Sequence, residues 1–180
     1  MTIAPGTYAL GPDDATLTVR TGKAGAAAKA GHNLVIEVTT WKATLDLGHD
    51  PAETTLALTA DARSLRVRDG SGGMGELGGD EKASIEQSID DDVLKGGAIE
   101  FRSTSVEPGS GGALRVRGDL DLLGRRRPIA FDLDASGRRL TGSARFKQTD
   151  FGMKPFSTLF GTLKVADEVE VAVDATLPGV

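Results

Sequence analysis

The chain has 180 residues, which favours one domain spanning residues 1–180 that buries roughly 70 % of the surface of the unfolded chain. Its 26 acidic residues outnumber its 21 basic residues, and the net charge of -5 argues against a general nucleic-acid-binding protein. The absence of cysteine excludes disulfides and thiolate metal sites, and no apolar run approaches the ~20 residues of a membrane-spanning helix.

The first ten residues, MTIAPGTYAL, contain neither the basic nor the apolar region of a secretory signal. We therefore expect a cytoplasmic protein with no stable insertion into a membrane. A short alanine-rich stretch, AGAAAK from Ala24, predicts a short helix. The apolar positions from Leu34 to Val38 and those from Trp41 to Leu47 have opposite parity, which predicts a bulge or turn at Thr39–Thr40.

Strict alternation of apolar and polar residues becomes clear from the middle of the chain onward. The alternating sets occupy residues 56–62, 114–122, 129–135, 140–146 and 169–177. A period of two is typical of antiparallel strands with one dry face and one wet face. With the shorter segments and the glycine- and proline-rich turns between them, about eight strands predict an all-β barrel or sandwich. One longer helix is predicted over about residues 80–95, because Ile85, Ile89 and Val93 fall on one helical face.

A glycine-rich segment, RVRDGSGGMGELGGDE, contains the spacing of a dinucleotide-binding turn at residues 70–75. Such a turn needs repeated βαβ units, which the alternating pattern does not provide. Asp80 and Glu81 would also bring negative charge to the helix N-terminus, where a phosphate would bind. We interpret the segment as a glycine loop at one end of the barrel, and Arg125 to Arg127 as a charged hairpin tip.

The chain has two histidines and no recognisable set of metal ligands. His32 lies between the alanine-rich stretch and the next strand, and His49 lies in a predicted turn. We interpret His32 as a structural residue at the barrel rim. The functional alternative is that His32 forms a hydrogen bond with the polar end of a ligand. We expect no cofactor and no metal.

Three segments of the second half resemble the YceI-like family. They are FKQTDFGMKPFSTLFGTLKVADEVEVAVDATL at the end, LRVRGDLDLLGRRRPIAFDL before it and GGAIEFRSTSVEP after the predicted helix. The resemblance covers roughly residues 30–177 and is strongest from Ala98 onward. It implies an eight-stranded, lipocalin-like antiparallel barrel that encloses an apolar tunnel. Family members bind polyisoprenoid chains, and many of them are exported.

The resemblance implies binding, sequestration or transport of an isoprenoid or another long-chain lipid, without catalysis. The segment from Phe151 to Phe160 is so apolar that we expect it to fold over the barrel mouth as a lid or entrance wall. Besides His32, the predicted ligand-binding residues are Leu34, Ile36, Val38, Phe101, Phe131, Phe146, Phe151, Met153, Phe156, Phe160, Val171 and Val173.

Two alternatives stay open from the sequence. The barrel cavity can be the active site of a cyclase or isomerase, with His32 or a buried carboxylate as the acid–base group. Alternatively, side chains fill the barrel and the protein acts through its surface. Whether two barrels pair as a homodimer is also open, because alternation reports which face of a strand is dry and not how full the interior is.

Overall fold

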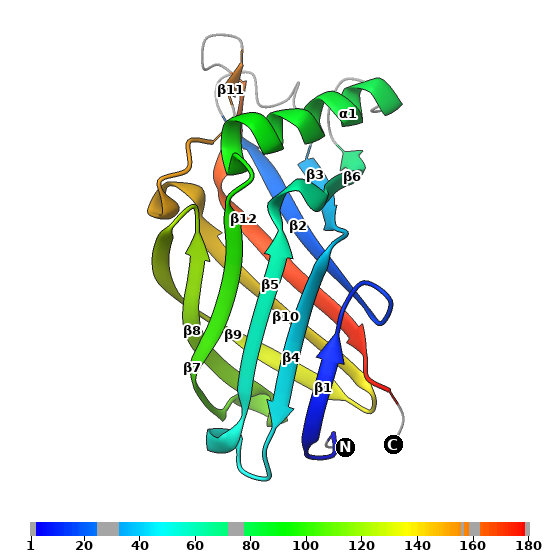
Figure 1. Cartoon of the computed structure of the whole chain (residues 1–180), viewed down its shortest axis with the longest axis vertical. Coiled ribbons are helices and arrows are strands. Elements are labelled where there is room, and N and C mark those ends of the chain that lie inside the picture. The colour runs from blue at the N-terminus through cyan, green and yellow to red at the C-terminus, as the bar shows by residue number, and fades with distance from the viewer. Residues whose placement is uncertain (1–2, 25–32, 72–77, 156, 159–162, 179–180) are drawn as a thin grey trace.

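The computed structural model describes residues 3–24, 33–71, 78–155, 157–158 and 163–178. Within these ranges, twelve antiparallel strands form one sheet that curls into a barrel-like wall (Figure 1). The all-β barrel class predicted from the alternation is therefore confirmed. No described helix has the length and apolar character needed to cross a membrane.

The strands follow a path in which most sequence neighbours are also spatial neighbours. Along this path the order is β1-β4-β5-β7-β8-β9-β10-β12-β2-β3-β6, and β11 pairs with β12. The strands are β1 (Gly6–Leu10), β2 (Ala15–Ala24), β3 (Asn33–Val38), β4 (Trp41–Leu47), β5 (Thr55–Asp61), β6 (Leu65–Ser71), β7 (Ala98–Pro108), β8 (Leu114–Leu122), β9 (Arg125–Ser136), β10 (Arg139–Lys147), β11 (Ser157–Thr158) and β12 (Leu163–Thr176).

The predicted count of eight strands is wrong, and two bends explain much of the difference. The predicted bend at Thr39–Thr40 is confirmed, since β3 ends at Val38 and β4 begins at Trp41. The neighbouring strand breaks at the same level, where the 3₁₀ segment η3 (Ala62–Ser64) separates β5 from β6. Hydrogen bonds hold the two bends together, among them one from the Thr39 N–H to the Ser64 carbonyl oxygen at 2.9 Å. The short strands β1 and β11 account for the rest.

The predicted longer helix is present and crosses one end of the barrel (Figure 1). It consists of α1 (Gly79–Ser88) and a π-helical turn, η4 (Ile89–Leu94). At its start, the Gly78 N–H donates to Glu81 Oε2 at 3.1 Å, so Glu81 satisfies a free donor of the first turn. The alanine-rich helix predicted over residues 24–29 falls, at residues 25–29, outside the described residues, and so does the part of the predicted glycine loop over residues 72–77.

The remaining connections are short. Three further 3₁₀ segments are η2 (Pro51–Glu53), η5 (Ser110–Gly112) and η6 (Gln148–Phe151). Leu123 and Gly124 form the turn between β8 and β9, and both have positive φ, of 55° and 74°. The predicted hairpin therefore exists, but the three arginines that were assigned to its tip begin β9 instead, with exposed side chains.

Candidate functional site

The barrel encloses an apolar cavity of about 520 Å³, which is within the range of small-molecule sites. None of the described residues that line it carries an ionisable side chain. The lining residues are Leu10, Leu17, Val19, Thr21, Gly22, Leu34, Ile36, Val38, Trp41, Ala43, Leu56, Leu58, Ala60, Leu65, Ser84, Ile85, Ser88, Ile89, Val93, Leu94, Ile99, Phe101, Leu120, Leu122, Ile129, Phe131, Leu133, Leu140, Gly142, Ser143, Ala144, Phe146, Gln148, Met153, Val165, Val169, Val171 and Val173.

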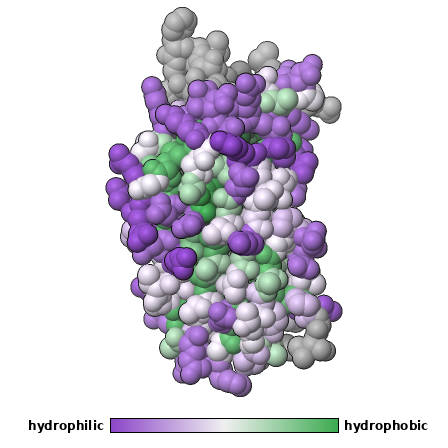
Figure 2. Space-filling model, viewed as in Figure 1, coloured by the Kyte–Doolittle hydropathy of each residue, from purple (hydrophilic) through white to green (hydrophobic). Residues whose placement is uncertain are grey.

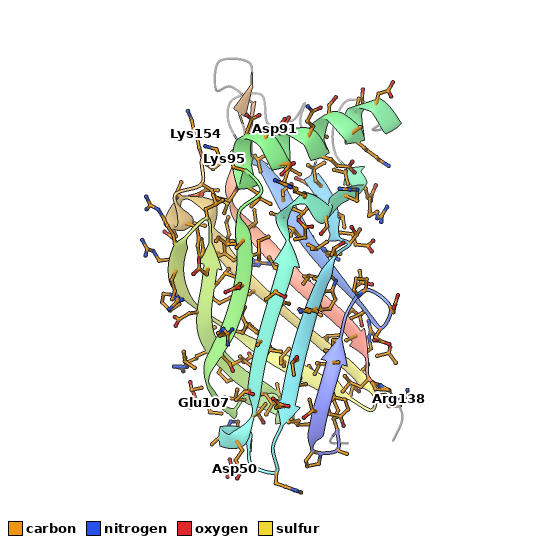
Figure 3. The ribbon with its side chains drawn as sticks, viewed as in Figure 1. Asp50, Asp91, Lys95, Glu107, Arg138 and Lys154 are labelled. Atoms are coloured by element: carbon orange, nitrogen blue, oxygen red, sulfur yellow. The ribbon has the colours of Figure 1, made fainter. Side chains whose placement is uncertain are left out.

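The cavity does not run the full length of the barrel, because packed side chains fill the end opposite the helix. The residues of this apolar plug are buried and absent from the lining: Tyr8, Leu45, Val106, Val116 and Leu177. Figure 3 shows Asp50, Glu107 and Arg138 at this end, and Asp91, Lys95 and Lys154 at the other. The cavity is therefore closed by the plug and reaches up to the helix.

The helix contributes an apolar face to the cavity. Ile85, Ile89 and Val93, the residues that predicted the helix, all line the cavity. Glu86 attaches α1 to the barrel, because its Oε1 accepts a hydrogen bond from the Val67 N–H of β6 at 2.9 Å. The outer surface of the helix is hydrophilic, whereas hydrophobic surface lies directly below it on the face that Figure 2 shows. The helix thus separates an apolar interior from solvent.

Nine of the thirteen predicted ligand-binding residues lie around this cavity. They are Leu34, Ile36, Val38, Phe101, Phe131, Phe146, Met153, Val171 and Val173. The structure does not place Phe151 in the lining: this side chain is 1 % exposed and packs edge-on against Phe146, with ring centroids 5.2 Å apart. His32, Phe156 and Phe160 lie outside the described residues, and so does Leu159 of the predicted lid.

Several cavity residues were not singled out by the sequence analysis. Trp41, Leu58 and Leu120 lie in alternating runs that predict a dry face, but the alternation does not distinguish a lining residue from a packed one. The helical residues could have been identified, since an apolar stripe on the one long helix must face the barrel. Ser84 and Ser88 of the same helix also border the cavity and add hydroxyl groups to its edge.

The DFG segment, residues Asp150 to Gly152, is held in place by the neighbouring strand β12. Thr149 donates two hydrogen bonds to the Asp167 carboxylate, one from its N–H at 2.9 Å and one from its Oγ1 at 2.6 Å. Burial raises the pKa of Asp167, but the hydrogen bonds from Thr149, the charge of Lys147 and the N–H of Gln148 outweigh this effect and lower the pKa below its ordinary value. Gln148 Nε2 donates to the Ala166 carbonyl oxygen at 3.1 Å.

These contacts coincide with an irregularity in the cavity wall. The register of β12 against β2 shifts between Val165 and Val169, so the extra residues form a bulge opposite Gly22. Met153, which follows the DFG turn, is 6 % exposed and lines the cavity. Asp167 on the bulge thereby fixes the turn that leads to Met153.

The described part of the site offers neutral hydrogen-bonding groups and no ionisable side chain. The polar lining side chains are Thr21, Trp41, Ser84, Ser88, Ser143 and Gln148. In the part of the chain that the structure describes, no three histidine, aspartate or glutamate residues come together as a metal site. The arrangement can therefore surround a long apolar molecule and contact it at a few neutral polar points.

Comparison with known proteins agrees with this architecture. The chain is similar to Burkholderia cenocepacia BcnA, with a TM-score of 0.63 and 18% sequence identity over 89% of this chain and 94% of that one. It is also similar to a mutant CJ YCEI protein solved with a monobromobimane guest, with a TM-score of 0.57 and 15% identity over 81% of this chain and 85% of that one. No curated protein matches the chain.

At such identities, the similarity to solved structures supports the fold alone. The family assignment has a separate basis, which is a model of the YceI-like domain that matches residues 8–177. This match spans nearly all of the barrel, from Tyr8 in β1 to Leu177 after β12. The chain therefore belongs to the YceI-like family.

Proposed function

We propose that the protein binds a long-chain isoprenoid or a similar amphiphilic lipid in the barrel cavity and sequesters or transports it without catalysis. The observation that carries this proposal is the cavity of about 520 Å³, whose described lining is apolar and free of ionisable side chains. Family membership supports the proposal, because members of the YceI-like family bind polyisoprenoid chains and the family match covers the strands that form the cavity wall.

Hydrocarbon burial supplies the driving force. Removing a methylene group from water contributes about 0.8 kcal/mol, so a chain that fills the cavity gains several kcal/mol without any specific polar contact. Ordering the chain and losing its translational freedom offset part of this gain. A ligand with one long apolar part therefore suits the cavity better than a compact polar metabolite does.

The enzymatic alternative requires a group that the described lining does not provide. An acid–base catalyst must lie within hydrogen-bonding distance of the reacting atoms, and the described lining contains no carboxylate, histidine, lysine or arginine. Within the described lining, every side chain with hydrogen-bonding atoms is neutral. This composition favours a carrier or sequestering protein over a cyclase or isomerase.

Tryptophan fluorescence tests the proposal directly, because the single tryptophan of the chain, Trp41, lines the cavity. Titration with geranylgeraniol is expected to change the emission of Trp41 and to saturate at one molecule per chain. The variant Ala144→Phe places a ring in the cavity and is expected to weaken binding by about tenfold or more, because it removes space for the chain.

The matched control is Ala130→Phe, which adds the same ring to an exposed position on β9. This control is expected to bind geranylgeraniol like the wild type. The proposal is wrong if the wild type gives no saturable change, or if Ala144→Phe and the wild type bind equally well.

A further inference from the structure

The barrel wall is interrupted between β9 and β10. The two strands pair as far as Gly142 opposite Leu133, and no pair follows toward the helix-covered end, although the structure describes every residue from 125 to 147. Both strands continue beyond this point, since β9 stays paired with β8 and β10 stays paired with β12. Residues 125–132 of β9 and 143–147 of β10 therefore form two strand edges with no ladder between them. This interruption is called the window below.

The window is bounded by packed structure at both of its ends. At the base, a Cβ on Gly142 would lie 2.7 Å from Leu133 Cδ2 and 3.1 Å from the Asp132 carbonyl oxygen, so the strands are in close contact there. At the upper end, η6 follows β10 and contacts both β9 and β10. Phe151 of η6 packs against Phe146 of β10. The window is therefore an opening within the wall and not the frayed end of a strand.

The cavity extends to this window. Its lining includes Ile129 and Phe131 of β9 and Ala144 and Phe146 of β10, which are inward-facing residues of the two edges. It also includes Ser143, which alternation places on the outer face of β10 and which is exposed. In β4, β5, β7, β8 and β9 the lining residues are every second one, so an outer-face residue in the lining is exceptional. Ser143 thus places the cavity beside the unpaired edge of β10.

We infer that the window between β9 and β10 is the entrance of the cavity, and that the polar end of the bound amphiphile stays in it. This inference rests on the proposed function and adds the route and the orientation of the ligand. The hydrocarbon passes between the apolar residues of the two edges into the interior, where the described lining has no ionisable side chain.

The chemistry of the window suits a polar head group. Strand edges without a ladder leave backbone N–H and C=O groups free to form hydrogen bonds with a hydroxyl or carbonyl group of the ligand. A head group held there also keeps contact with water, so the ligand avoids the cost of burying its polar end in an apolar cavity. The interrupted ladder gives up backbone hydrogen bonds within the barrel, and the entrance gives this loss a function.

Single-cysteine variants test the inference, because the chain has no cysteine of its own. Ser143→Cys places a thiol at the edge of the window. Asp134→Cys is the matched control, since Asp134 is exposed on β9 where this strand is still paired with β10. Saturation with geranylgeraniol is expected to slow the reaction of Ser143→Cys with a small maleimide about tenfold, and that of Asp134→Cys less than twofold, because a thiol must be accessible to react.

The rate of entry provides a second readout. A polyethylene glycol maleimide is coupled to each variant, and the association of geranylgeraniol is followed by stopped-flow emission of Trp41, which lines the cavity. Each labelled protein is compared with its own unlabelled form. The label on Ser143→Cys is expected to slow association about tenfold or more, and the label on Asp134→Cys less than twofold. Gln87→Cys, at an exposed position of α1, reports on entry beneath the helix instead.

Two results would overturn the window as the entrance and leave lipid binding intact. One is equal protection of Ser143→Cys and Asp134→Cys by the ligand. The other is slower association with the label on Gln87→Cys but not with the label on Ser143→Cys. Failure of the unlabelled wild type to bind geranylgeraniol would overturn the proposed function and the entrance with it.

Discussion

At the scale of single residues, the packing of the barrel interior depends on glycine positions, where the lack of a side chain leaves room for a neighbouring ring. Gly118 lies on β8, in a run of alternating residues whose other members are apolar. A Cβ at this position would clash with the backbone carbonyl oxygen of Arg102 and would lie 2.5 and 2.7 Å from two ring atoms of Phe101, which is closer than such atoms approach without a shift. The glycine therefore makes room for the ring of Phe101, which contacts Phe131 with centroids 5.5 Å apart.

Gly118→Ala is expected to destabilise the protein by roughly 1–3 kcal/mol, because the added methyl group forces Phe101 or the backbone of β7 to move. Urea unfolding measures the change. Gly79→Ala is the matched control, since a Cβ there meets no atom within 4 Å and alanine favours the helix. Equal stability of Gly118→Ala and the wild type would contradict this account of the close packing of Phe101 and the Arg102 backbone against Gly118.

The residue scale also shows what the sequence could and could not predict. Parity identified Leu34, Ile36 and Val38 as inward-facing, and the structure places all three in the lining. Phe151 has the same apolar character but packs against Phe146 outside the lining, because its position in η6 depends on tertiary contacts that alternation does not encode.

At the scale of elements, local patterns located one bend and the longer helix but did not predict the number of strands. The parity change at Thr39–Thr40 located the bend, and the isoleucine spacing located α1 and η4. The matching break between β5 and β6 also carries a parity change, from Leu58 and Ala60 to Leu65 and Val67, but it was not predicted. The count of eight strands missed this break because the predicted alternating run ended at residue 62.

The attachment of η6 to β12 gives a prediction with a defined pH dependence. The lowered pKa of Asp167 means that the folded protein holds this carboxylate charged at a lower pH than the unfolded chain does. Its stabilising contribution is therefore complete above the ordinary value of 3.8 and is lost as the pH falls through the lower folded pKa. Acid is expected to loosen the turn that leads to Met153.

Asp167→Asn is expected to lower the stability by roughly 1 kcal/mol near neutral pH, with partial exposure limiting the effect. The difference from the wild type is expected to shrink below about pH 4, where protonation begins to weaken the same contacts in the wild type. Thermal unfolding at about pH 6 and about pH 3 measures both differences. Asp134→Asn, an exposed aspartate on β9, is the control. A difference that stays constant with pH would contradict the assigned role of Asp167.

At the scale of the whole molecule, the fold follows from alternation, whereas the open volume does not. The same dry faces that form the cavity also form the plug of Leu45, Val116 and Leu177 at the other end. The alternation of apolar and polar residues does not distinguish these two regions. The free volume depends instead on the sizes of side chains from several strands at one level of the barrel. The cavity of about 520 Å³ is therefore a property of the assembled barrel.

The division of the barrel into a plug and a cavity fits a protein that holds a chain with one polar end. The packed apolar side chains of the plug stabilise the fold. The side chains around the cavity pack less fully, which costs stability and leaves space for a ligand. Occupation of the cavity is then expected to stabilise the folded protein, since a ligand that binds only this state shifts the unfolding equilibrium.

The most direct test of this account is the native mass spectrum of the protein purified from a host rich in isoprenoid lipids, compared with its denatured spectrum. The account predicts an additional species on the native protein, lost on denaturation, with the mass of an isoprenoid or acyl amphiphile and a ratio of one per chain. A native mass equal to that of the chain alone, together with no binding of added geranylgeraniol, would contradict the claim that the cavity is a lipid-binding site.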